Sequence, residues 1–205
     1  GETVQITGAG RTDTGVNAIN YVAHFEICSL KNFEAEQLSY KLNAMLPREI
    51  TIHEVCEVNE EFHARFDAQS REYCYFIHFR KDPFAEKYSY RMRYPLDLEA
   101  MNEACSHLLG EHDFSCFEKT GGNNTTSMHV RLMGAPYAEG EYIVFRIRAN
   151  RFLRNMVRAI VGSLIEVGRG KKEPSWIRDL ISCGTRSDAG QSVPGTALFF
   201  CGAQY

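Results

Sequence analysis

The sequence lacks any run of about 18 apolar residues, the length that a helix needs to cross a bilayer. It also does not open with a charged stretch followed by an apolar one, which is the pattern of a secretory leader. These two absences predict a soluble, cytoplasmic protein. Hydrophobic residues make up 44% of the 205 residues, enough for a substantial core in one large domain or two small ones.

The sequence has no Cys-x-x-Cys pair, and its number of cysteines, seven, is odd. They are scattered, mostly among apolar neighbours, at positions 28, 56, 74, 105, 116, 183 and 201. This pattern favours reduced thiols in the core over disulfides or a zinc site. The seven histidines show no metal-ligand spacing and no cofactor motif is evident, so we expect neither a metal nor a cofactor.

The glycine-rich segment 8–16 does not end in Gly-Lys-Ser or Gly-Lys-Thr, so it is not a phosphate loop. It lies between two short alternating runs, residues 4–7 and 21–27, which predict strands. Glycines permit positive φ and close backbone approach, which suits a loop that receives a bulky ligand. The segment has three of them, at Gly8, Gly10 and Gly15.

Arg11 and Asp13 are the chemically active side chains of this segment. An arginine near an aspartate favours the ionised carboxylate, which can act as a nucleophile or stabilise positive charge. The same sequence is also typical of an ordinary turn, in which Asp13 accepts backbone hydrogen bonds and Gly15 takes the left-handed conformation. The spacing alone leaves both interpretations open.

The net charge of −3 disfavours a nucleic-acid partner, but the charge is unevenly distributed along the chain. Residues 63–94 carry 7 basic and 4 acidic side chains, and residues 146–172 carry 8 and 1. Aromatic residues interleave both segments, a pattern suited to phosphate contact combined with base stacking. We expect the two segments to form one phosphate-binding face, and the alternative is an ordinary solvated surface.

The hydrophobic pattern predicts an alternation of helices and strands. Helical spacing predicts helices at residues 34–46, 97–109, 150–168 and 174–183. The residues predict further strands at 50–55, 71–79 and 142–149. We expect the first helix to face the core, and we expect Asp97 to cap the second. Arg154 and Arg158 should share a face of the third helix.

Residues 118–129 contain few side chains that could be buried, so we expect them to form a mobile loop. Together these elements predict an α/β or α+β fold.

Residues 10–16, Gly-Arg-Thr-Asp-Thr-Gly-Val, resemble the active-site motif of the TruA family of tRNA pseudouridine synthases. In that family the loop aspartate is the catalytic nucleophile, and the resemblance assigns this role to Asp13. The neighbouring arginine, here Arg11, helps to open the RNA and to hold the target nucleotide out. Asn17 stands where the family usually has histidine.

A second stretch, residues 71–79, follows Phe-His-Ala-Arg at 62–65 and resembles the second motif of the family. The tyrosine of that motif packs on the target uracil, which the resemblance assigns to Tyr73. Arg65 is a further candidate for RNA contact. On residue type alone, Tyr73 and Tyr75 are equally well explained as core aromatics of a strand.

Two later segments also resemble the family. Met-Val-Arg followed by Ile-Val-Gly, within residues 156–162, resembles its third motif, whose arginine pairs with the catalytic aspartate. That arginine is Arg158 here. Residues 193–200 resemble the closing strand of the family, whose leucine lines the uracil pocket, which is Leu198 here, with Ala197 in place of a usual glycine.

The resemblance covers nearly all of the chain and implies an α+β fold. Two domains join mixed and antiparallel sheets flanked by helices, and the cleft between them holds the active site. We expect an N-terminal domain at residues 1–62, lacking the first strand and helix of the family, and a C-terminal domain at 63–205. The chain is therefore expected to be a fragment.

The implied reaction is the isomerisation of uridine to pseudouridine in tRNA, without a cofactor or metal. The resemblance points to uridines 38, 39 and 40 of the anticodon arm and to a homodimer. One alternative is an RNA-binding module without catalysis, or an inactive fragment of such an enzyme. Another is a carbohydrate-active enzyme, which needs a second acid that no motif here supplies.

Overall fold

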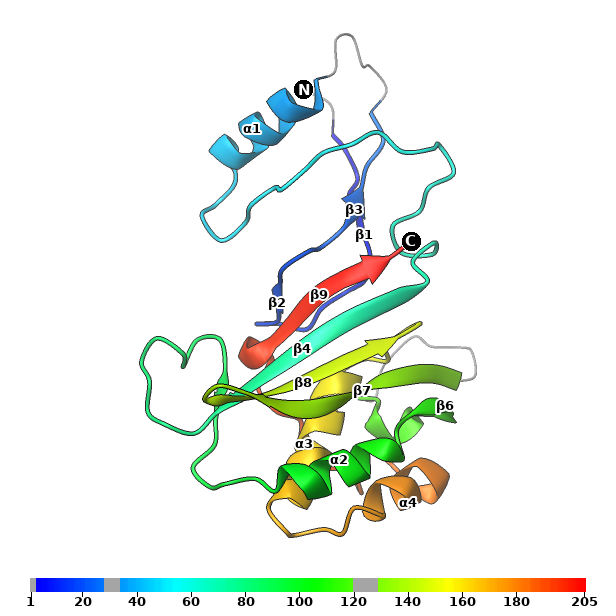
Figure 1. Ribbon diagram of the computed structural model, residues 1–205. Helices are drawn as coiled ribbons and strands as arrows, with labels where there is room; N and C mark the ends of the chain where they lie inside the picture. The colour runs from blue at the N-terminus through cyan, green and yellow to red at the C-terminus, as the bar shows by residue number, and fades with distance from the viewer. Residues whose placement is uncertain (1–2, 28–33, 120–128) are drawn as a thin grey trace.

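The protein is described by a computed structural model over residues 3–27, 34–119 and 129–205 (Figure 1). Its centre is one seven-stranded sheet in the spatial order β2-β9-β4-β8-β7-β6, with β5 beside β4. The strands are β2 (Asn17–Ala18), β4 (Ser70–His78), β5 (Tyr90–Arg91), β6 (Gly110–Asp113), β7 (His129–Glu139), β8 (Tyr142–Ala149) and β9 (Leu198–Gln204). The β2–β9 and β4–β5 pairs are parallel and the other pairs antiparallel. A separate antiparallel pair joins β1 (Thr7–Gly8) to β3 (Ala23–His24).

One face of the sheet is covered by helices (Figure 1). The helices are α2 (Leu98–Ser106), α3 (Met156–Gly168) and α4 (Trp176–Cys183), with the 3₁₀ turns η1 (Ser115–Phe117) and η2 (Gly195–Ala197). Alternate residues of β4 and β8 point toward this layer, and Tyr75, Ile77, Phe145 and Ile147 are buried there against the apolar stripe of α3. The fold is therefore α+β, as predicted.

Helix α3 packs unusually closely against the segment that leads into β9. A Cβ added to Gly162 would lie 1.9 Å from the Gln191 carbonyl oxygen, so only glycine allows this contact. The Ser163 hydroxyl accepts a hydrogen bond from the Gly190 amide at 2.9 Å. The Val193 amide then donates to the Arg158 carbonyl. This packing fixes the first turn of α3 relative to the start of β9.

Several predicted elements are confirmed. The runs at 71–79 and 142–149 correspond to β4 and β8, and the Asp97 carboxylate caps α2 by accepting from the Ala100 amide at 2.9 Å. Helix α2 ends at Ser106, and Gly110 has a φ of +98°. The run at 174–183 corresponds to α4. The closing strand starts at Leu198 rather than at 193, because η2 occupies the residues just before it.

The expected strand at 50–55 is wrong, since these residues form no ladder in the described structure. The Asn43 side chain explains this, because it bonds both the amide and the carbonyl of Ile52, at 2.7 and 2.9 Å, as a neighbouring strand would. Helix α1 (Ala35–Met45) forms as predicted, but it buries no residue and Met45 is 84% exposed. Figure 1 shows α1 standing apart from the sheet, so its apolar side has no second layer among the described residues.

Other expectations need correction. The third helix begins at Met156, not at residue 150, because Asn155 has a left-handed φ of +65°. Arg154 therefore precedes the helix and does not share a helical face with Arg158. The strands β6 and β7 were not expected. Most of the expected loop at 118–129 lies outside the described residues.

The six cysteines within the described residues are free. Cys74, Cys105 and Cys116 are buried as expected, whereas Cys56 and Cys183 are exposed and so are not core thiols. Cys28 lies outside the described residues. Within the described ranges, no group of three or more metal-binding side chains is placed to hold an ion, and no helix is long and apolar enough to span a bilayer.

The sheet crosses the predicted domain boundary, because β2 from the N-terminal part pairs with β9 at the C-terminal end. The division near residue 62 itself stays a prediction.

Candidate active site

The centre of the candidate site is an ion pair between Asp13 and Arg158. Asp13 lies in the loop between β1 and β2, and Arg158 lies in the first turn of α3. The Arg158 Nη1 donates to the Asp13 Oδ2 at 2.9 Å, while its Nε donates to the Val193 carbonyl at 2.7 Å. The two side chains are 29% and 22% exposed. The carboxylate is therefore held in one orientation and still reaches solvent, and the ion pair expected from the family resemblance is present.

The loop that carries Asp13 is anchored on η2. Asn17 donates through its side-chain amide to the Thr196 carbonyl at 2.7 Å. A Cβ on Gly195 would lie 2.9 Å from the Thr14 carbonyl oxygen, so this glycine permits the close approach of the loop. Gly15, with a φ of +81°, closes the turn whose Val16 amide donates to the Asp13 carbonyl.

The other two glycines of the loop behave differently from the sequence expectation. Gly8 and Gly10 do not adopt positive φ. Gly8 instead makes room for Tyr21, whose ring and hydroxyl would overlap any Cβ built there. The Tyr21 hydroxyl donates to the Gly10 carbonyl. Tyr21 therefore stabilises the first half of the loop, a role that the sequence pattern did not indicate.

Tyr73 lies beside the ion pair on the helix-covered face of β4. Its ring packs edge-on against Phe152 and Phe200, with centroids 5.0 and 5.3 Å away. Burial, with smaller contributions from Tyr21 and from the negative charge of Asp13, raises the pKa of Tyr73 from 10.0 to about 12, and Arg71 opposes this rise. The phenol thus stays protonated at neutral pH and feels the charge of Asp13.

This shift predicts a pH dependence of stability. Because the folded state holds the Tyr73 proton more tightly than the unfolded state, its stabilising contribution is complete below pH 10 and is lost as the pH rises to about 12. We expect the free energy of unfolding in urea to fall between about pH 10 and pH 12, and Tyr73→Phe to make that fall shallower.

The control variant is Tyr40→Phe, because Tyr40 is 76% exposed on α1. It should leave the slope unchanged. Some slope should remain in Tyr73→Phe, because burial also raises the pKa of other groups, including Tyr75, Tyr205 and Cys105. An identical slope in Tyr73→Phe and the unmodified protein would contradict this assignment.

The remaining predicted site residues lie at different depths. Leu198 is buried as the first residue of β9, directly after η2, and Ala197 before it has no exposed surface. Arg11 is exposed on the same loop as Asp13. Arg65 is exposed in the turn before β4, with its guanidinium 5.7 Å from the Phe66 ring centroid. The structure thus brings Asp13, Arg158 and Tyr73 together and leaves the two other arginines at the surface.

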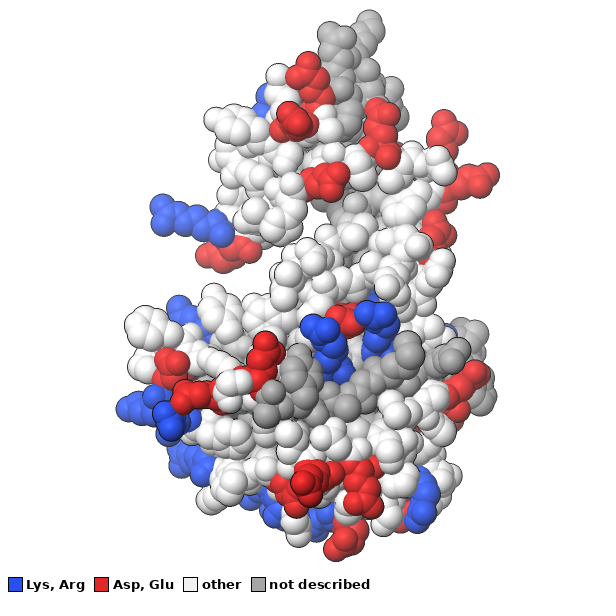
Figure 2. All heavy atoms as spheres, in the orientation of Figure 1, with Lys and Arg blue, Asp and Glu red and all other residues white. Residues whose placement is uncertain are grey.

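The predicted basic segments do not gather on one face. Arg146 and Arg148 point away from the helix layer and meet Glu72, at 3.8 and 2.7 Å, whereas Arg158 points toward Asp13. Figure 2 shows acidic side chains over the N-terminal part of this view, and acidic and basic side chains intermixed over the rest. Residues 146–172 therefore distribute their charge over both sides of the sheet.

Sequence reasoning missed one further residue at this site, Arg71. It lies two residues before Tyr73 on β4, so its side chain leaves the strand on the same face. A signal was present, because a charged residue at a core-facing position of an alternating strand is unusual unless it is paired or hydrogen-bonded.

An ion-paired, partly exposed carboxylate on an anchored loop, in a site that also holds a buried phenol, is chemically able to act in covalent catalysis. A family model described as tRNA pseudouridine synthase matches residues 104–205. The chain belongs to this family of tRNA pseudouridine synthases, as the relatives below also show.

Three similar proteins all have the name tRNA pseudouridine synthase A. The chain is 45% identical to that of Bacteroides fragilis over 203 residues, which is 98% of this chain and 80% of that protein. Identity to the Parabacteroides distasonis protein is 46%, over the same shares of the two chains. The Brevibacillus brevis protein is 40% identical over 97% of this chain and 81% of its own length.

Proposed function

We propose that this protein isomerises uridine to pseudouridine in the anticodon arm of tRNA, at positions 38–40, with Asp13 as the catalytic nucleophile. The observation that carries the proposal is the Asp13–Arg158 ion pair, in a chain that is 45% identical to a tRNA pseudouridine synthase A. The proposed place of action is the cytoplasm.

The reaction needs covalent capture and positioning, and it exchanges no electrons with a cofactor. The bond between the ribose carbon and N1 of uracil breaks, the base turns, and C5 bonds to the same carbon. The proton lost from C5 is balanced by the one gained at N1. An ionised aspartate suits a centre of this kind, as carboxylates do in glycoside hydrolysis.

The other site residues fit supporting roles. The Arg158 guanidinium holds one carboxylate oxygen of Asp13, which leaves the second oxygen available for the substrate. Tyr73 and Leu198 are assigned to the wall of the uracil pocket, although only 9% and 5% of their surfaces are exposed. The target base must leave its stack at a cost of about a few kcal/mol, which exposed Arg11 and Arg65 can offset by contacts to the RNA.

The test is incubation of transcript tRNA with the protein, followed by mapping of pseudouridine along the anticodon arm. Pseudouridine at positions 38–40 is the expected result, and a tRNA without uridine there should stay unmodified. Binding of tRNA without any modification would favour the alternative, an RNA-binding module. Pseudouridine at other positions would keep the reaction and overturn the proposed target.

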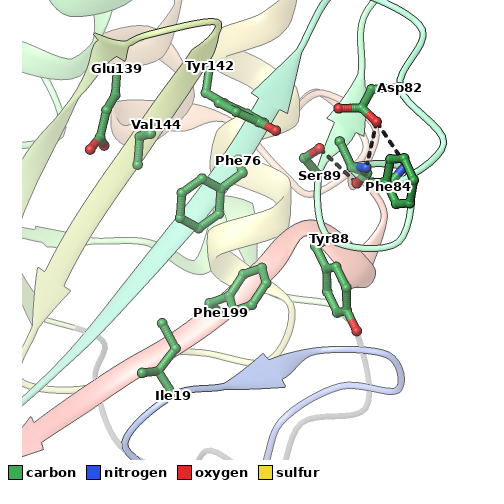
Figure 3. A pocket seen from close by; sticks show the side chains of 11 residues that line it. Ile19, Phe76, Asp82, Phe84, Tyr88, Ser89, Glu139, Tyr142, Val144 and Phe199 are labelled. Atoms are coloured by element: carbon green, nitrogen blue, oxygen red, sulfur yellow. Dashed lines mark hydrogen bonds between the residues drawn. The ribbon is translucent and has the colours of Figure 1, made fainter.

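We further propose that the protein acts as a homodimer. The sheet face opposite the helices is open and holds a cavity of 530 Å³ between β4, β8, β9 and the segment at 82–89 (Figure 3). Its wall is largely aromatic, with Phe76 packing on Phe199, while Phe84 and Tyr88 are 90% and 54% exposed. A second copy would bury this surface.

Light scattering in solution tests the dimer. The expected mass is that of two chains, and Phe84→Asp should shift the equilibrium toward monomer because it places a charge in the apolar face. A monomeric unmodified protein would overturn the proposal.

A further inference from the structure

Arg71 makes an unusual set of hydrogen bonds. Its Nε donates to the Ala9 carbonyl at 3.2 Å, and its Nη1 donates to the carbonyls of Ala68 and Asn150 at 3.1 and 2.8 Å. Its Nη2 donates to the Arg65 carbonyl. One half-buried guanidinium therefore donates to four backbone carbonyls within the described part of the chain.

Two of the four acceptors, Arg65 and Ala68, lie in the turn just before β4, and the other two, Ala9 and Asn150, are far from Arg71 in the sequence. Ala9 has no exposed surface and opens the loop that carries Asp13. Asn150 lies directly after β8 and begins the segment that leads to α3 and Arg158. Arg71 thus joins the backbone of the segment that leads to Asp13 to the backbone of the segment that leads to Arg158.

Both backbone polar groups of Ala9 are hydrogen-bonded. Its amide donates to the Val22 carbonyl at 2.9 Å, and its carbonyl accepts from Arg71. Loss of the guanidinium would free one side of this peptide and leave a buried carbonyl without that donor. The movement would pass to Asp13, four residues further along the loop.

Four carbonyl acceptors around one side chain favour arginine over lysine at this position. A guanidinium presents five donors in a planar fork, whereas a lysine ammonium has three donors at one point. Burial lowers the pKa of Arg71, with the phenols of Tyr205 and Tyr73 acting in the opposite direction, so the protein keeps a cation here at a cost. A side chain that only filled space could be apolar and would avoid the desolvation of a charge.

We propose that Arg71 is a positioning residue for the reaction proposed above, which sets the loop carrying Asp13 in register with the helix carrying Arg158. It does not touch the substrate, and it acts through Asp13. Because displacements of about 1 Å at reacting groups cost about a hundredfold in rate, the effect should fall on kcat rather than on KM.

The first experiment compares kcat and KM on tRNA for Arg71→Lys and Arg71→Ala with Arg178→Lys as the control. Arg178 is 62% exposed on α4, and its side chain pairs with the exposed Asp179. Arg71→Lys should lower kcat about tenfold or more with little change in KM. Added guanidinium at low millimolar concentration should restore part of kcat to Arg71→Ala, and an alkylammonium ion of similar size should not.

The second experiment is independent of activity. Amide hydrogen exchange of the peptide covering residues 8–16 should be faster in Arg71→Lys, while exchange in β8 should match that of the unmodified protein. Unchanged exchange in the loop together with unchanged kcat overturns the inference. Faster exchange everywhere, with a matching loss of thermal stability and no rescue, assigns Arg71 a merely structural role and also overturns it.

The experiments distinguish a wrong function from a wrong role for Arg71. If the unmodified protein forms no pseudouridine, the function is wrong, and loop exchange in Arg71→Lys alone decides whether Arg71 positions the Asp13 loop. If the unmodified protein is active and Arg71→Lys is equally active, the function stands and the positioning role is wrong.

Discussion

Asp13→Asn is expected to abolish pseudouridine formation, with a loss of at least about 10³-fold in turnover. Asparagine has the same shape and still offers an oxygen to Arg158, so the loop should keep its place. It lacks the negative charge and the nucleophilic oxygen on which covalent catalysis depends. The measurement is the rate of pseudouridine formation in single-turnover experiments with excess protein over tRNA.

Two further measurements separate this effect from misfolding. The thermal midpoint and the affinity for tRNA should stay close to those of the unmodified protein, because Asp13 is one partly exposed side chain. The matched control is Asp179→Asn, since Asp179 is 61% exposed on α4 and should be silent in all three assays. Substantial turnover by Asp13→Asn would remove Asp13 from the role of nucleophile.

Arg158→Ala should have the second largest effect, a loss of about 10²-fold or more in turnover. The variant removes both the donor to the Asp13 Oδ2 and the donor to the Val193 carbonyl, so the carboxylate loses its orientation. Stability should fall far less, because both side chains of the pair reach solvent, where ion pairs contribute little. Arg158→Lys should recover part of the rate, since it restores a cation but not the second bond.

A double variant shows whether the two residues act as one unit. If Arg158 acts by orienting Asp13, then Asp13→Asn combined with Arg158→Ala should be no slower than Asp13→Asn alone. Additive losses would mean that Arg158 contributes separately from Asp13. Arg178→Ala, with its surface guanidinium, is the control.

The sequence was sufficient where one local pattern determines a structure. The alternation in β8 and the Asp97 cap of α2 are properties of a few neighbouring residues, and both are present as expected. The proximity of Asp13 and Arg158 is different, because they are 145 residues apart. Only the resemblance to a family indicated that pair, and the roles of the site residues stay predictions.

The misses have physical reasons. The strand expected at 50–55 is absent because the Asn43 side chain occupies the hydrogen bonds of Ile52, and no propensity shows such a competitor. The start of α3 was misplaced because Asn155 takes a left-handed φ in the middle of a helical pattern. Arg71 went unnoticed as a site residue because its partners are backbone carbonyls of three segments, and such partners cannot be identified from the sequence.

The pairing of β2 with β9 determines when the contacts of the Asp13 loop can form during synthesis. The ribosome makes the Asp13 loop before the partners of that loop, which are Arg158, η2 and β9. Contacts of such long sequence separation close slowly and only after the intervening chain is available. The Asp13 loop of a nascent chain therefore cannot make these contacts until β9 has left the ribosome.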